Sequence, residues 1–179
     1  METKISPAKS GLQLGLLFGV IMVLEFVISY IIGVEKLIGS SFGVIINLLN
    51  YLILPFLFIY LGCSNYKKSN DGFVTFSECL KIGVSITVIA ALIYATFNLI
   101  FNLIFPDFGE QILRITKSEI LKKSPNMTAE QMDMAISMTK KFMSQYIVFP
   151  VTIVMYAFFG LLYSFLVGAI VKKDSNQSF

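Results

Sequence analysis

The stretch GLQLGLLFGVIMVLEFVISYII, residues 11–32, decides the fold class of this chain, and Glu25 is its one charged residue. As a helix it would extend about 33 Å, enough to cross a hydrocarbon core of about 30 Å. Lys4 and Lys9 precede it as in a secretion signal. However, the run exceeds the roughly 7–15 apolar residues of a signal, and no small-residue cleavage site follows. We therefore expect a retained membrane-spanning helix.

Three further apolar runs follow, at residues 40–62, 79–105 and 147–171. Of the 179 residues, 56% are hydrophobic and the mean hydropathy is +0.78, whereas soluble domains are roughly 45–50% apolar. No linker with a shift in composition divides the chain. The sequence therefore predicts an all-α integral membrane protein, a single domain over residues 1–179 with a bundle of four transmembrane helices.

Prolines and turn residues suggest where these helices bend or end. Pro55 is expected to kink the second helix and Pro106 to end the third. Residues 63–78 read as a polar connection with a turn at residues 69–72. Because the connection between the first two runs is short, we expect those helices to form a tight antiparallel hairpin.

The polar segment at residues 106–145 has helical signals of its own. Acidic residues near its start and lysines near residue 123 complement the dipole of a helix over residues 107–123. Thr128 and Gln131 form a capping box for a second helix, whose pattern runs to Gln145 and could continue into the fourth span with a bend at Pro150. We expect a helical loop between the third and fourth spans.

The distribution of lysine predicts the orientation. The short loop after the first run has only Lys36, whereas the two termini and the 63–78 connection share one side, with Lys4, Lys9, Lys67, Lys68, Lys172 and Lys173. Loops rich in lysine and arginine stay in the cytoplasm. The segment at residues 106–145 has six basic residues but also five acidic ones, and the rule weakens for charges that lie far from a span. We therefore expect both termini in the cytoplasm and the helical loop at residues 106–145 outside.

Several function classes are disfavoured. The chain has no histidine, which removes the commonest general base and metal ligand. Cys63 and Cys79 lack the spacing of a zinc or redox motif and would face the reducing side, so we expect ordinary thiols. No catalytic motif occurs, and Glu25 alone cannot supply paired acids. We expect no enzyme activity, no cofactor and no metal site.

The net charge of +3 comes from basic residues that flank the apolar runs, an arrangement typical of membrane anchors and not of nucleic-acid binding. Thioethers in the loop favour Cu(I), but with no cysteine or histidine nearby we prefer an amphipathic helix resting on the bilayer or a partner. The methionines concerned are Met127, Met132, Met134, Met138 and Met143.

Small residues recur at spacing four on three of the predicted helices. Such stripes let neighbouring helix backbones approach closely. They serve contacts within a chain and between copies alike, and we favour contacts within the chain. The stripes are Gly11, Gly15 and Gly19 on the first helix, Gly160, Ser164 and Gly168 on the fourth, and a weaker set, Gly83, Thr87, Ala91 and Ala95, on the third.

Glu25 is the one acidic residue predicted to lie in the hydrocarbon core. A carboxylate there is costly, so such a residue marks either a pathway or a polar partner. Counting residues along each helix places further polar groups at the same depth, and we expect a cluster around Glu25 that is either a structural network or a conducting or ligand-binding site. Its other members would be Ser29, Asn47, Asn50, Tyr94, Asn98 and Tyr156.

The chain resembles the domain of unknown function 4199 family of small bacterial membrane proteins, known from the Bacteroidetes lineage. The resemblance is carried by the first helix with Gly15 and Gly19, by GFVTFSECLKIGVSITVIAALIYATFNLIF at residues 72–101, and by FGLLYSFLVGAIVKKD at residues 159–174. Residues 72–76 are its most specific part. The resemblance implies four spans with an outer helical segment in the bacterial inner membrane, and it implies no activity.

Two functional hypotheses remain open. The first is a non-enzymatic membrane protein that acts by association, with its outer helical loop contacting a membrane partner, another copy or the lipid surface. The second is a subunit of a small oligomeric transporter or channel that uses Glu25 and a polar stripe at spacing four on the third helix, formed by Tyr94, Asn98 and Asn102. Four spans leave little room for an internal path, so the second hypothesis requires an oligomer.

Overall fold

The computed structural model describes residues 6–174, so Lys4 lies outside the described residues. Four stretches are long and apolar enough to cross a membrane: Pro7–Ile32, Ser41–Ser69, Phe76–Ile104 and Gln145–Val171. The predicted all-α fold with four spans is confirmed. The elements are α1 (Pro7–Ser10), α2 (Leu12–Ile32), η1 (Val34–Lys36), α3 (Ser41–Leu48), η2 (Leu49–Ile53), α4 (Leu54–Ser69), α5 (Phe76–Ile104), α6 (Asp107–Lys123), α7 (Ala129–Phe142) and α8 (Gln145–Val171).

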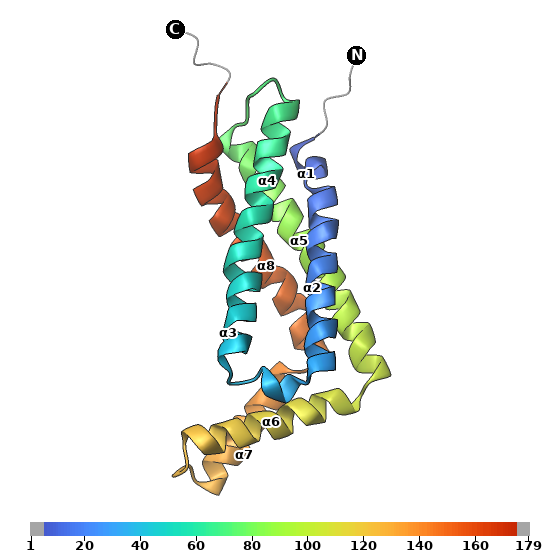
Figure 1. Cartoon of the computed structure of the whole chain (residues 1–179), viewed down its shortest axis with the longest axis vertical. Helices are drawn as coiled ribbons and strands as arrows, with labels where there is room; N and C mark the ends of the chain where they lie inside the picture. The colour runs from blue at the N-terminus through green and yellow to red at the C-terminus, as the bar shows by residue number, and fades with distance from the viewer. Residues whose placement is uncertain (1–5, 175–179) are drawn as a thin grey trace.

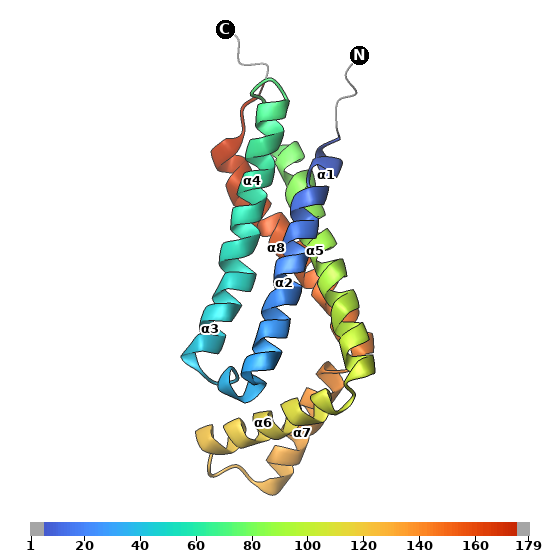
Figure 2. The ribbon, with the colours of Figure 1, turned by 45° about the vertical axis from the view of Figure 1, so that its right-hand side comes forward.

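The spans run side by side along the long axis of the molecule (Figure 1). Helix α1 and the last turns of α8 lie at one end of the bundle, here called the terminal end, and α6 and α7 cross the other, the loop end (Figures 1 and 2). Helix α5 is the centre of the bundle, since α8, α2 and α4 all pack against it. The expected tight hairpin of the first two spans is wrong, because α2 and α4 pack on α5 far more than on each other.

Both strong small-residue stripes pack against α5 of the same chain. A Cβ atom built on Gly15 would lie 2.9 Å from Ile89 Cβ and 3.0 Å from the Ile86 carbonyl oxygen. On α8, a Cβ built on Gly160 would lie 3.2 Å from the Gly83 carbonyl oxygen and would overlap Thr87. Contacts this close leave no room for a side chain, so these stripes serve packing within the chain.

The remaining stripe residues make the same kind of contact with α5. Gly11 and Gly19 face it from α1–α2, and on α8 Ser164 faces Gly83 and Gly168 faces Phe76. Ser164 and Thr87 are fully buried in this interface. The Thr87 hydroxyl donates to the Gly83 carbonyl oxygen at 3.1 Å, so this polar group adds no unpaired donor to the packed surface.

The terminal end is fastened by the residues between α4 and α5. Gly72 has φ +81°, a left-handed conformation that favours glycine. Val74 then exchanges two backbone hydrogen bonds with Lys173, at 3.0 and 2.9 Å, and Thr75 forms a capping box with Glu78. The bonds between Val74 and Lys173 tie the α4–α5 turn to the chain that follows α8.

The expected polar connection at residues 63–78 is wrong in extent, because α4 continues as a helix to Ser69. Lys67 and Lys68 lie in its last turn, where cations complement the helix dipole. Lys67 also donates to the Val171 carbonyl oxygen at 2.8 Å. The helix therefore extends beyond its apolar part, and only a short turn joins it to α5.

The expected direct continuation from the loop helix into the fourth span is also wrong. Helix α7 ends at Phe142, and Ser144 has extended backbone angles of φ −59° and ψ 130°, which start α8 anew at Gln145. Pro150 lies inside α8, one turn and a half further on. Figure 2 shows α7 folded back beside α6 before the chain enters α8. The loop is thus a pair of helices across the loop end.

Candidate functional site

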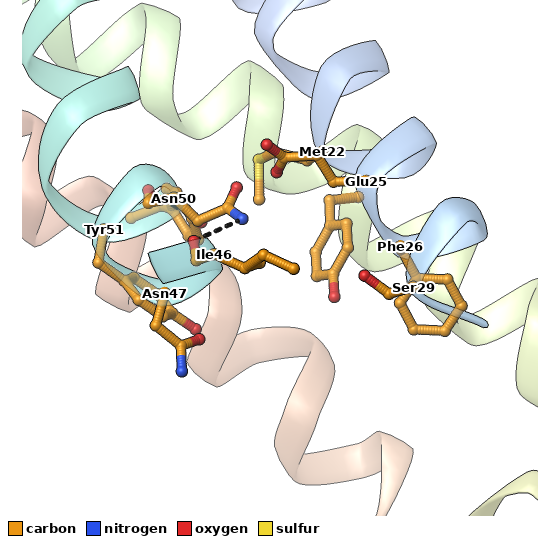
Figure 3. Close-up of a pocket in the computed structure, with 10 residues that line it drawn as sticks. Met22, Glu25, Phe26, Ser29, Ile46, Asn47, Asn50 and Tyr51 are labelled. Atoms are coloured by element: carbon orange, nitrogen blue, oxygen red, sulfur yellow. Dashed lines mark hydrogen bonds between the residues drawn. The ribbon is translucent and has the colours of Figure 1, made fainter. Parts of the chain in front are cut away.

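A polar cavity of 150 Å³ lies in the loop-end half of the bundle, where α2 and α3–η2 stand apart. Glu25 enters it from α2, about 10 Å along the helix axis from the end of α2. All four spans contribute to the lining, and Figure 3 labels the lining residues of α2 and α3–η2 in close-up. The lining residues are Met22, Glu25, Phe26, Ser29, Ile46, Asn47, Asn50, Tyr51, Tyr94 and Tyr156.

The structure brings most of the predicted cluster together but not all of it. Six predicted members line the cavity: Glu25, Ser29, Asn47, Asn50, Tyr94 and Tyr156. Asn98 does not line it. Its side-chain oxygen accepts instead from Gln145 Nε2 at 3.3 Å and from Asn102 Nδ2 at 3.2 Å. Asn98 therefore belongs to a separate polar contact between α5 and the start of α8.

Two buried oxygens face this cavity without a hydrogen-bond partner among the described residues: Glu25 Oε2 and Asn50 Oδ1. Asn50 Nδ2 donates to the Ile46 carbonyl oxygen at 3.2 Å, the dashed line of Figure 3. This bond fixes the amide orientation, because turning the amide would set two oxygens against each other. A buried acceptor left without a donor costs about 1–3 kcal/mol.

A π-helical turn places Asn50 and Tyr51 at this wall. Pro55 follows the turn and has no N–H, so the Tyr51 carbonyl oxygen loses its α-helical donor. The Leu54 N–H bonds to the Leu49 oxygen, which frees the Asn50 carbonyl as well. The kink expected at Pro55 is thus a π turn directly before it.

Two tyrosine hydroxyls from α8 satisfy these freed carbonyls. Tyr163 donates to the Tyr51 carbonyl oxygen at 2.6 Å, and Tyr156 to the Asn50 carbonyl oxygen at 3.5 Å. Irregular backbone inside a membrane is tolerated where protein groups supply the missing bonds. Tyr51 was not among the predicted site residues, because only the extra residue of the π turn brings it to the cavity beside Asn50. Pro55 was the one sequence signal for this irregularity.

A packed aromatic layer closes the cavity toward the terminal end. The Phe18 ring is fully buried and stacks on Phe58, with centroids 5.1 Å apart. It also meets Tyr156 edge to face at 6.1 Å. Met22, which is 4% exposed, lies between Phe18 and Glu25 on α2. The cavity therefore has a floor on this side.

Toward the loop end the cavity adjoins a larger hollow of 470 Å³, here called the vestibule. The two share the lining residues Ser29, Ile46 and Asn47. The rest of the vestibule is formed by residues 37–40, Gly43 and Val44, with Lys123 from the end of α6. A series of hollows thus leads from beneath α6 to Glu25.

Charged groups of α6 lie beside this vestibule. Glu119 pairs with Lys122 at 2.7 Å, and a Cβ built on Gly39, a vestibule residue, would contact the Glu119 side chain. The hydrogen bond from Lys122 holds the pKa of the Glu119 carboxyl below its ordinary value. The rim therefore carries charges of both signs, whereas the cavity lining carries only Glu25.

The two cysteines lie elsewhere. Cys63 and Cys79 are free, fully buried thiols in the terminal-end half, and the Cys63 Sγ lies 3.9 Å from the Cys79 carbonyl oxygen. Neither lines the cavity or the vestibule. The chemistry available beside Glu25 is therefore hydrogen bonding, by amides and hydroxyls, around one ionisable carboxyl.

The model of a family described as a protein of unknown function, DUF4199, matches residues 13–173. No curated protein and no solved structure matches the chain. The matched segment contains most of α2 and the whole of α3 to α8, and so every residue that lines the cavity.

Proposed function

The chain belongs to the DUF4199 family, whose function is unknown, and within that family we propose that it is a non-enzymatic, multi-pass protein that binds a small solute beside Glu25. The observation that carries this proposal is the pair of buried oxygens, Glu25 Oε2 and Asn50 Oδ1, that face a cavity without a donor. In a purely structural network, each of these oxygens would accept a hydrogen bond from a donor on a neighbouring helix. Because neither oxygen has a donor, we infer that a small solute supplies the missing contacts when it enters the cavity.

The membrane address and orientation are part of the same proposal. We place the protein in the bacterial inner membrane with both termini in the cytoplasm, as the lysines near the terminal end favour. The vestibule then opens toward the outer side. Because an aromatic layer of Phe18, Phe58 and Tyr156 lies beneath the cavity, a one-sided binding site fits the single chain better than a channel does.

Water-filled access from the loop end is the first testable consequence. We expect Ser29→Cys, in the shared wall of cavity and vestibule, to react with a membrane-impermeant cationic methanethiosulfonate added to right-side-out vesicles. Leu24→Cys on the same helix is the control: its side chain is 54% exposed on the bundle surface, and a thiol in hydrocarbon does not ionise. Modified protein is counted by mass spectrometry.

The native cysteines do not interfere with this measurement, since Cys63 and Cys79 are fully buried. Labelling of Ser29→Cys only in inverted vesicles would contradict the orientation. Absence of labelling from either side would contradict an accessible site and with it the proposed function.

A second candidate function is association through α7. Three of its side chains at spacing four, Met134, Met138 and Phe142, are 62%, 54% and 65% exposed and form one apolar stripe. Tyr146, at the start of α8, is 94% exposed as well. Met132, by contrast, is buried. An apolar stripe on an otherwise polar helix is typical of a surface that rests on a partner or on lipid.

Charges placed on this stripe are expected to disrupt the association. Extracted in a mild detergent, the wild-type chain of 20.0 kDa should form a complex with a membrane protein or with itself, and Met138→Glu/Phe142→Glu should release a single chain. Lys140→Glu, between the two positions but off the stripe, should keep the complex. The readout is mass photometry of the solubilised particles. A wild type that is already monomeric would contradict this candidate.

A further inference from the structure

We propose that the Glu25 cavity binds a small monovalent cation, held between the Glu25 carboxylate and the Asn50 side-chain oxygen. This inference rests on the proposed function and names the class of its ligand. It follows from four features of the cavity: which atoms lack partners, which atoms surround them, how much charge the lining carries, and how large the space is.

The atoms without partners are both acceptors. Glu25 Oε2 and Asn50 Oδ1 are buried and receive no hydrogen bond. Asn50 Nδ2 uses one of its two N–H groups on the Ile46 carbonyl oxygen, which leaves one amide N–H for the Glu25 carboxyl. A carboxylate and an amide oxygen that face the same space repel an anion. The missing group must therefore bring positive charge or hydrogen-bond donors.

The surrounding atoms are hard oxygen ligands, which alkali cations prefer. Thiol and imidazole groups, by contrast, favour transition metals. Hydroxyls of Ser29, Tyr94 and Tyr156 line the same space. Tyr156 directs its proton to the Asn50 backbone oxygen, which leaves the lone pairs of its hydroxyl for a ligand. Carboxylate, amide and hydroxyl oxygens thus converge from all four spans.

The charge of the lining matches one positive charge. Glu25 is its one ionisable carboxyl, and no cationic side chain lines the cavity. A monovalent cation would neutralise the carboxylate, whereas a divalent ion would leave a net charge buried in the membrane, which is costly. Lys123 lies at the vestibule instead, where salt screens an exposed charge over about 8–10 Å.

The cavity is larger than a proton needs. A proton on Glu25 could bridge to Asn50, but it would leave most of the 150 Å³ empty, and this is room for several water molecules. A sodium or potassium ion with part of its water shell, or a methylammonium ion, would occupy it. The π turn beside the cavity agrees with this use, since irregular helix in membrane proteins is found where ions are coordinated.

The test measures cation-dependent stability of the full chain in nanodiscs. The buffer holds pH and ionic strength constant with N-methylglucamine chloride, whose cation is too large for the cavity, and replaces it stepwise by sodium, potassium or methylammonium chloride. We expect the thermal unfolding midpoint of the wild type to rise and saturate with at least one of these ions, because a ligand that binds only the folded state stabilises it. The arm that responds identifies an alkali ion or an amine.

Matched variants tie the effect to the cavity. Glu25→Gln keeps the shape but removes the charge and should lose the shift, whereas Glu35→Gln, in η1 outside the lining, should keep it. Should Glu25→Gln fail to fold, Asn47→Asp adds a second carboxylate to the lining and should lower the half-saturating cation concentration.

Several outcomes would overturn the inference. These are a wild-type midpoint that no ion changes, a shift that survives in Glu25→Gln, a half-saturating concentration unmoved in Asn47→Asp, and a midpoint that responds to pH alone, which would mean that a proton bridges Glu25 and Asn50. If Ser29→Cys is still labelled in such a case, the solute site stands and only its ligand class is wrong. If labelling fails as well, the proposed function fails with it.

Discussion

Replacement of Gly83 by leucine is expected to separate α8 from α5 and to destabilise the bundle. A Cβ at this position would overlap the Ser164 side chain and lie 3.0 Å from Ile59 Cγ2. Both neighbours are fully buried, so neither can move aside into open space. Overpacking of this kind costs about 1–3 kcal/mol and occasionally more, and we expect the upper end.

The measurement is the thermal unfolding midpoint in nanodiscs, supported by resistance to trypsin. Gly109→Leu is the matched control: Gly109 lies in α6, where a built Cβ has no neighbour within 4 Å, and leucine has the higher helix propensity. We expect the control to unfold at or above the wild-type midpoint. Equal midpoints for the two variants would contradict the close approach of α5 and α8.

Replacement of Phe18 by alanine is expected to cost about 3–5 kcal/mol, as for other buried phenylalanines. Phe18 is fully buried, stacked on Phe58 at 5.1 Å and edge to face with Tyr156 at 6.1 Å. In a bilayer, helices associate mainly through van der Waals contact, and a cavity here removes that contact from three spans at once.

The control for Phe18→Ala is its neighbour Leu17→Ala. Leu17 is 53% exposed on the outside of the bundle, where lipid replaces the lost contacts, so we expect a change within about 0.5 kcal/mol. Denaturant unfolding in mixed micelles gives both values. Similar losses in the free energy of unfolding for the two variants would mean that Phe18 and Leu17 do not differ in burial. That result would contradict the packed aromatic layer beneath the Glu25 cavity.

The small-residue stripes show which part of the helix packing can be predicted from the sequence and which part needs the structure. Spacing four on Gly11, Gly15 and Gly19 already predicts a close helix contact, but the spacing is equally suited to another copy of the chain. Only the folded bundle, in which α2 and α8 both lie on α5, identifies the partner helix. The reason is that a stripe of small residues determines how closely two helices can approach, but not which helix is the partner.

The polar cluster around Glu25 could also be predicted only in part. Depth along each helix places Glu25, Asn50 and Tyr156 at one level, and this needs only the rise per residue. It does not determine how each helix is rotated, and for this reason Asn98 was expected at the cavity but bonds Gln145 instead. Tyr51 was missed because a π turn adds a residue to the helix and changes which side chains face inward.

By itself, the sequence determined the membrane class, the four spans, the helical loop and the capping box of Thr128 and Gln131, because each depends on local rules: apolar length against bilayer thickness, and pairing of backbone groups within one segment. The tertiary structure alone decided that α5 is the centre, that α7 breaks before α8, and that a carboxyl and an amide oxygen meet unpaired in one cavity. These features depend on the rotation and tilt of each helix relative to its neighbours. The sequence of one helix alone does not determine them.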